Sequence, residues 1–212
     1  LAGFYPVSVG IENGVELLRE KVTQGYSLMA FPEGTRSHTH KIKRFHKGAF
    51  YLAEQLNLDI LPVVIHGNSE VNPKGSFIIK DGSLTLKILP RIALDDVAFG
   101  ETYSQRAKKV GVYFRKNFAQ LRQELEGATY FHKIVLEDFR YKSDALYKEV
   151  KRDLRKNTEA YHKILSYLCK TESVIHLSES CGQLDFLLAL DGPDRKIFSF
   201  VEKESSQKTL SN

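Results

Sequence analysis

The spacing of apolar and polar positions divides the first part of the chain into alternating helices and strands. Residues 15–22 have apolar side chains at a helical spacing that stops at Gly25, and residues 48–56 repeat this spacing. The short apolar runs 26–31 and 60–65 are typical of buried strands. A strand, a helix and a second strand in this order predict a βαβ unit, and therefore a partly parallel sheet flanked by helices.

A hairpin and a long amphipathic helix are predicted next. Residues 76–79 and 83–89 flank Asp81 and Gly82, a pair typical of a tight turn. Apolar side chains then recur every three or four positions from 103 to 125, which predicts one helix with a basic opposite face. That basic face could contact a membrane surface, but packing of the apolar stripe against the sheet is the default interpretation.

The remaining sequence predicts a linker and the start of a second domain. We expect the first domain to cover residues 1–130 and a helical linker to cover 131–170, with its clearest helix over 144–168. Within residues 171–212, a strand, a helix and a strand predict an incomplete βαβ unit that opens a Rossmann-like domain. The expected strands lie at 174–177 and 196–201, on either side of a helix at 184–190.

The composition is that of a globular protein, with 212 residues of which 42% are hydrophobic and 27% are charged. The longest apolar run is far shorter than the roughly 20 residues that a membrane-spanning helix needs. Cys169 and Cys181 lack the spacing of metal ligands and are predicted to be free thiols in a reducing compartment. Since the chain begins at Leu1 and its one Met is internal, we expect it to be a piece of a longer protein.

The positive charge is concentrated in the first part of the chain. The net charge is +5, and residues 1–130 hold 17 basic against 13 acidic side chains. Five basic residues lie within twelve positions: Arg36, Lys41, Lys43, Arg44 and Lys47. Such a cluster either binds an anionic partner or forms a solvated loop. The cluster lacks interleaved aromatic residues at a spacing recognised for nucleic-acid binding, and its histidines are interpreted as solvated, so neither a nucleic acid nor a metal is predicted.

The segment Phe31–Ser37, with the sequence FPEGTRS, carries the most informative chemistry. It follows a predicted strand, and ligands commonly bind where the strands of an open α/β sheet end. Arg36 can grip a phosphate through two parallel hydrogen bonds, and Gly34 lets an anion approach backbone N–H groups. From the residues alone, a phosphate site and a capped turn with a surface arginine remain equally open.

The same segment resembles the third sequence block of the glycerolipid acyltransferases, the lysophosphatidate (1-acylglycerol-3-phosphate) acyltransferase family. Residues 44–50 resemble the F-K-x-G stretch that follows this block, and residues 60–64 resemble the fourth block. Residues 3–8 stand where the second block belongs, although Val9 occupies a position where the family usually has arginine.

The resemblance extends to about residue 126 and implies a mixed α/β fold and an enzyme. The implied reaction moves a fatty acyl group from acyl-CoA or acyl carrier protein to a lysophosphatidate-like acceptor in phospholipid synthesis. The reaction requires no cofactor. The resemblance also implies a peripheral position at the cytoplasmic face of a membrane, and it leaves the oligomeric state open. The resemblance implies that the acceptor's phosphate region is bound by Glu33, Gly34, Thr35 and Arg36, and that Lys47 adds positive potential.

The catalytic H-x4-D block of that family does not occur in these 212 residues. None of the seven histidines has an aspartate five positions later, and His132 with Glu137, the nearest approximation, lies on the wrong side of the third block. No catalytic residue is therefore predicted, and we expect the block to precede Gly3 in the parent protein. The alternative is a catalytically silent module that binds lipid phosphates, which Val9 favours.

A second resemblance concerns residues 174–202, which look like the start of an S-adenosylmethionine-dependent methyltransferase. Gly182 would stand in the turn that the cofactor approaches, and Glu202, twenty residues later, would bind its ribose hydroxyls. A third hypothesis therefore assigns the function to this second domain, with the acyltransferase-like part as an accessory.

Overall fold

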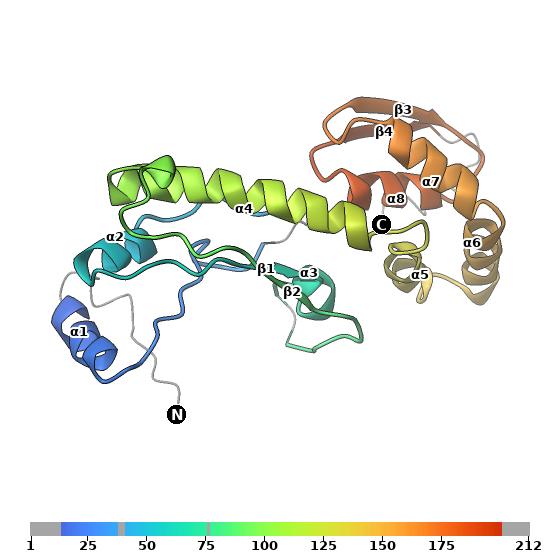
Figure 1. The fold of residues 1–212 in the computed structure, drawn as a ribbon. Helices are drawn as coiled ribbons and strands as arrows, with labels where there is room; N and C mark the ends of the chain where they lie inside the picture. The colour runs from blue at the N-terminus through green and yellow to red at the C-terminus, as the bar shows by residue number, and fades with distance from the viewer. Residues whose placement is uncertain (1–13, 38–40, 76, 201–212) are drawn as a thin grey trace. The chain divides into compact units, whose positions relative to one another are not determined.

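In a computed structural model of the chain, residues 14–37, 41–75 and 77–200 are described. They form two compact units, of which the first ends at Leu121 and the second comprises the residues from Arg122 onward together with Lys41 (Figure 1). Each unit is built around its own apolar clusters and is described here by itself.

The first unit is made of helices around one small sheet. In chain order it contains α1 (Val15–Thr23), α2 (Gly48–Gln55), β1 (Val63–His66), α3 (Asn68–Val71), β2 (Thr85–Ile88), the 3-10 helix η3 (Val97–Phe99) and most of α4 (Tyr103–Leu125). The three helices predicted from apolar spacing, which are α1, α2 and α4, are confirmed. Gly25 lies just beyond α1 with φ +89°, the left-handed conformation expected after a helix end.

The apolar stripe of α4 packs on the sheet, as predicted. Leu121 is buried with Val64 of β1 and with Leu89, and Phe118 covers this cluster. Nearer the start of the helix, Val110 joins a second cluster. The other buried members of that second cluster are Phe45, Phe50, Ile92 and Ala107. Figure 1 shows α4 extending along the first unit over β1 and α2.

The predicted hairpin is wrong. Residues 77–79 form no strand, and β2 pairs antiparallel with β1, so that Val63 is opposite Ile88. Phe77 is fully exposed, whereas the observed pairing buries Val64 and Leu89. A turn sequence at Asp81 and Gly82 is a local preference of small energy, and the burial gained by the long-range pairing outweighs it.

The parallel βαβ unit predicted for the first domain is also wrong. Residues 26–31 are not a strand, and Met29 and Phe31 are 86% and 69% exposed. A strand exists only with a backbone partner, and the two strands described in this unit, β1 and β2, pair with each other. The predicted strand at 60–65 is present in part, since Ile60 makes only an isolated antiparallel bridge to Ile92 before β1 begins.

The second unit combines helices with two parallel strands. It contains α5 (His132–Phe139), α6 (Asp144–Lys156), α7 (Thr158–Tyr167), β3 (Ser173–Leu177), α8 (Gln183–Asp191) and β4 (Lys196–Phe200). β3 and β4 are paired in parallel with α8 between them in the chain, and the three elements lie close to their predicted positions. The one helix predicted over 144–168 is two helices, because the chain breaks its helical course at Asn157.

Helices from the segment predicted as a linker supply most of the core of this unit. Phe139, Val150 and Leu154 are at most 1% exposed and form one cluster with Leu187 of α8. The short helix α5, which lies in the predicted helical linker but was not predicted as a separate helix, contributes Val135 and Phe139 to the same cluster. Residues 132–167 are therefore held by side-chain packing within the second unit.

Candidate functional site

The FPEGTRS segment forms a tight turn that is tied to the residues just before α2. The Gly34 N–H donates to the Phe31 carbonyl at 3.0 Å, and Gly34 has φ +70°. The Glu33 carboxylate accepts a hydrogen bond from the Lys43 N–H at 2.8 Å, and the His46 N–H donates to the Pro32 carbonyl at 2.7 Å. These bonds fix the turn against residues 43–46.

Gly34 is favoured by its backbone angle, and the exposed His46 ring lies close to it. A Cβ atom at this position would lie 3.1 Å from Cδ2 of His46, closer than most Cβ contacts, and the positive φ would strain any other residue. The predicted role of Gly34, which is to let an anion approach backbone N–H groups, stays a prediction. The neighbour that approaches in this structure is the His46 ring.

Arg36 is anchored at one nitrogen and open at the others. Its Nη1 donates to the Asn72 carbonyl at 3.1 Å and the Pro73 carbonyl at 3.2 Å, and it also contacts the side-chain oxygen of Asn72. Its Nε and Nη2 make no hydrogen bond to the residues that the structure describes. An arginine held in this way keeps an edge with two N–H groups that can face a phosphate.

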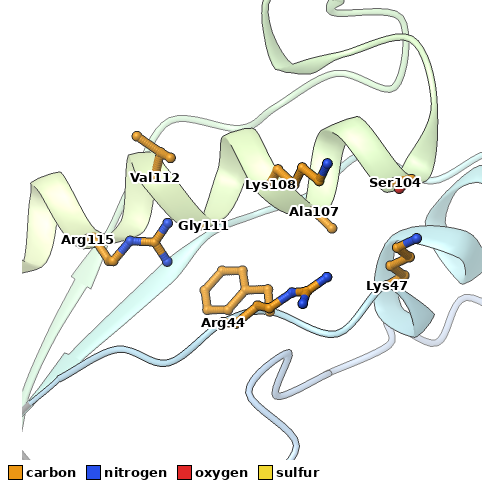
Figure 2. A pocket seen from close by; sticks show the side chains of 9 residues that line it. Arg44, Lys47, Ser104, Ala107, Lys108, Gly111, Val112 and Arg115 are labelled. Carbon is orange, nitrogen blue, oxygen red and sulfur yellow. The ribbon is translucent and has the colours of Figure 1, made fainter.

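A pocket of about 160 Å³ lies between the segment before α2 and the first half of α4 (Figure 2). Four basic side chains line it: Arg44 and Lys47 on one side, and Lys108 and Arg115 on α4. We name this set the basic pocket. None of the four makes a hydrogen bond or an ion pair with a residue in the described part of the chain.

The remaining walls of the basic pocket add no negative charge. They are formed by Phe45, Ser104, Ala107, Gly111 and Val112. Ser104 lies in the first turn of α4, and that turn contains no acidic residue, so the helix dipole contributes further positive potential. The arrangement is suited to binding an anion, and none of its lining residues is a histidine or a carboxylate that could act as a general base.

The structure brings the predicted site residues together only in part. Lys47 belongs to the basic pocket, and Glu33 and Gly34 contact the segment that carries Lys47. Thr35 is exposed and has no partner among the described residues, and the anchored part of Arg36 faces Asn72.

Sequence reasoning placed Lys108 and Arg115, two of the six basic residues of α4, on a basic face that could contact a membrane surface. Lys108 and Arg115 are seven positions apart, two helical turns, and so project from one side of the helix. That spacing is visible in the sequence. The side chains that they meet, Arg44 and Lys47, are distant in sequence and were brought together only by the fold.

The other histidine and cofactor predictions fall in the second unit or outside the described residues. His132 begins α5, where burial lowers the pKa of its imidazole, and its exclusion from the catalytic role stays a prediction. Gly182 has φ +85° and caps the start of α8. Glu202, with the loop histidines His38 and His40, lies outside the described residues, so the binding of S-adenosylmethionine stays a prediction.

Within the three described stretches of the chain, no group of three or more His, Cys, Asp or Glu side chains is placed to hold a metal ion. The same stretches contain no helix with both the length and the apolar character of a membrane span. Cys169 and Cys181 are free thiols, as predicted.

Comparison with known proteins identifies relatives of the first unit. Residues 4–66 match the family model "Acyltransferase". A 1-acyl-sn-glycerol-3-phosphate acyltransferase of Limnanthes douglasii is 36% identical over 89 residues, which are 42% of this chain and 32% of the relative. The enzyme of the same name from Saccharomyces cerevisiae is 39% identical over 74 residues, which are 34% of this chain and 24% of that protein.

One similar solved structure is that of the 1-acyl-sn-glycerophosphate acyltransferase PlsC from Thermotoga maritima. It is 28% identical, with a TM-score of 0.45, and the match covers 51% of this chain and 44% of that one. This chain spans about a third or less of the length of the curated relatives quoted above.

Proposed function

We propose that the protein is a glycerolipid acyltransferase that transfers a fatty acyl group to a lysophosphatidate-like acceptor, and the match of residues 4–66 to the family model supports this. The donor is acyl-CoA or acyl carrier protein, and the product is a precursor of membrane phospholipids. Because the acceptor is an amphiphile, the protein works at the cytoplasmic face of a membrane, either as a peripheral protein or as part of a larger membrane protein.

The observation that carries this proposal is the family match across the FPEGTRS turn. The geometry of the turn is compatible with acceptor binding. The unbonded edge of Arg36 and the exposed Thr35 hydroxyl are both available to a phosphomonoester. Glu33 holds the turn against residue 43, so its carboxylate positions the binding groups and need not contact the acceptor.

Acyl transfer requires a general base, and the histidine that the family uses for this does not occur in its usual motif within these 212 residues. In acyl transfer the acceptor hydroxyl loses its proton to a histidine, its oxygen attacks the thioester carbonyl, and the thiol leaves. The H-x4-D block that supplies this histidine is absent from the sequence given. We therefore assign to this chain the binding of the acceptor's phosphate region, and no proton transfer.

The substitution Thr35→Val, made in the full-length protein, tests this proposal. Thr35 has no partner among the described residues, so the substitution should leave the melting temperature unchanged. A hydrogen bond to a charged phosphate contributes about 1.5 kcal/mol or more, so the KM for lysophosphatidate should rise about tenfold. Phosphatidate formation from labelled acyl-CoA is the measurement, with monoacylglycerol as an acceptor that lacks the phosphate.

The KM for monoacylglycerol should be the same in the variant and the wild type. An equal rise for both acceptors would refute the assignment of Thr35 to the phosphate. A full-length protein that binds lysophosphatidate but forms no phosphatidate would refute the enzyme and leave the silent lipid-phosphate module.

A further inference from the structure

We infer that the basic pocket is a binding site for a phosphate group, to which α4 contributes Lys108 and Arg115. This goes beyond the FPEGTRS turn, since two of its four cations lie on a helix outside the residues that match the family model. It rests on the proposed function only for the choice of the phosphate compounds that would occupy it.

Charge is the first argument for this site. Four cations surround one small space with no acidic group in its lining, and none has a partner among the described residues. Like charges gathered in this way raise the electrostatic potential and destabilise the folded chain slightly. A bound anion relieves the repulsion and gains charge-assisted hydrogen bonds from several donors at once.

The size and walls of the pocket indicate which part of a ligand enters it. About 160 Å³ is well below the roughly 300–1,000 Å³ of pockets that hold drug-sized molecules. A phosphate or pyrophosphate group fits this space, whereas a fatty acyl chain does not. The ligand's remaining atoms would extend out of the pocket.

The backbone positions of the four cations are fixed by the core beneath them. Phe45, between Arg44 and His46, is 5% exposed and packs edge-to-face on Phe114 of α4, with ring centroids 5.1 Å apart. This contact joins the segment before α2 to the helix. The two pairs of cations are thus held near each other before any ligand binds, which lowers the entropic cost of binding.

Two sources of phosphate are compatible with this chemistry. Coenzyme A carries a pyrophosphate and a 3′-phosphate, and the acceptor carries a phosphomonoester on a glycerol. Isothermal calorimetry of the 212-residue chain with coenzyme A and, separately, with glycerol 3-phosphate distinguishes the donor side from the acceptor side. The measurements are made at constant ionic strength, since screening weakens any binding of this kind.

The test variant is Lys108→Gln with Arg115→Gln. Its matched control is Lys109→Gln with Lys116→Gln, which removes two positive charges from adjacent positions of the same helix outside the pocket. We expect the test variant to weaken binding of at least one ligand about tenfold or more, and the control to change it less than about twofold. Lys109 donates one exposed hydrogen bond to the Ala98 carbonyl, so the melting temperature of both variants is recorded.

If the test variant loses binding of coenzyme A alone, the pocket binds the donor's phosphates. If it loses binding of glycerol 3-phosphate alone, the pocket binds the acceptor's phosphate. Equal weakening by the test and control variants would overturn the inference, because net charge alone would then explain the binding. Failure of both ligands to bind the wild-type chain would overturn it too. Acyl transfer by the full-length protein is a separate measurement, so these failures leave the proposed function standing.

Discussion

The carboxylate of Glu33 should determine the local stability of the segment that carries Arg44 and Lys47. Its Oε2 accepts the Lys43 N–H at 2.8 Å in a half-buried position. A hydrogen bond to a charged acceptor contributes about 1.5–3 kcal/mol, and partial exposure places this bond at the lower end. Glu33→Ala should therefore raise the opening equilibrium at Lys43 about tenfold.

Amide hydrogen exchange measures this effect directly, because the Lys43 N–H is released when the bond breaks. Glu54→Ala is the matched control, since the Glu54 carboxylate accepts the Tyr103 N–H in the same unit, also at 2.8 Å. Each variant should speed exchange mainly at its own partner. Glu33→Gln keeps an acceptor without the charge, and its effect should be smaller, about two- to fivefold.

Unchanged exchange at Lys43 in Glu33→Ala would refute the reasoning, as would an equal rise at Lys43 in Glu54→Ala. The first result would mean that the bond contributes nothing net to the fold. The second would mean that the unit opens as a whole and that Glu33 has no local effect.

Two predictions concern the second unit. The Tyr161 hydroxyl donates to the Asp153 carboxylate, and burial together with that carboxylate raises the tyrosine's pKa to about 12. Since the unfolded tyrosine ionises near pH 10, the stability it contributes is complete below pH 10 and is lost as pH rises towards 12. Urea unfolding should show this loss in the wild type and much less of it in Tyr161→Phe; identical pH profiles would contradict the assignment. Leu154 is 1% exposed, so Leu154→Ala should lower the free energy of unfolding by about 2–5 kcal/mol, against less than about 1 kcal/mol for Ile175→Ala at a 69% exposed position. A change in Leu154→Ala as small as in Ile175→Ala would mean that α6 is not part of that core.

Helices were predicted well because their signal is local. The stripe from Tyr103 to Leu121 repeats over several turns, and a pattern of that length fits no other regular structure. α5 was missed because eight residues give barely two turns of periodicity. The break at Asn157 was missed because the apolar spacing continues across it into α7.

Strands were predicted poorly in the first unit because a strand is defined by its partner. The run 26–31 has strand-like composition and remains unpaired among the described residues, while β2 pairs with β1 and not with the residues across its local turn. In the second unit the two strands were predicted correctly. There each lies next to a clear helix, and the parallel pairing follows from the connection through α8.

The sequence by itself determined the resemblance to the glycerolipid acyltransferases, through FPEGTRS and the blocks around it, and most of the helices, because both depend on residues close together in the chain. It also indicated that positive charge gathers before α2. Only the tertiary structure decided that Arg44 and Lys47 meet Lys108 and Arg115 around one pocket, while one side of Arg36 is bonded to Asn72 and Pro73. The physical reason is that Phe45 is buried against Phe114 of α4, 69 positions later, and a contact over that distance leaves no local pattern in the sequence.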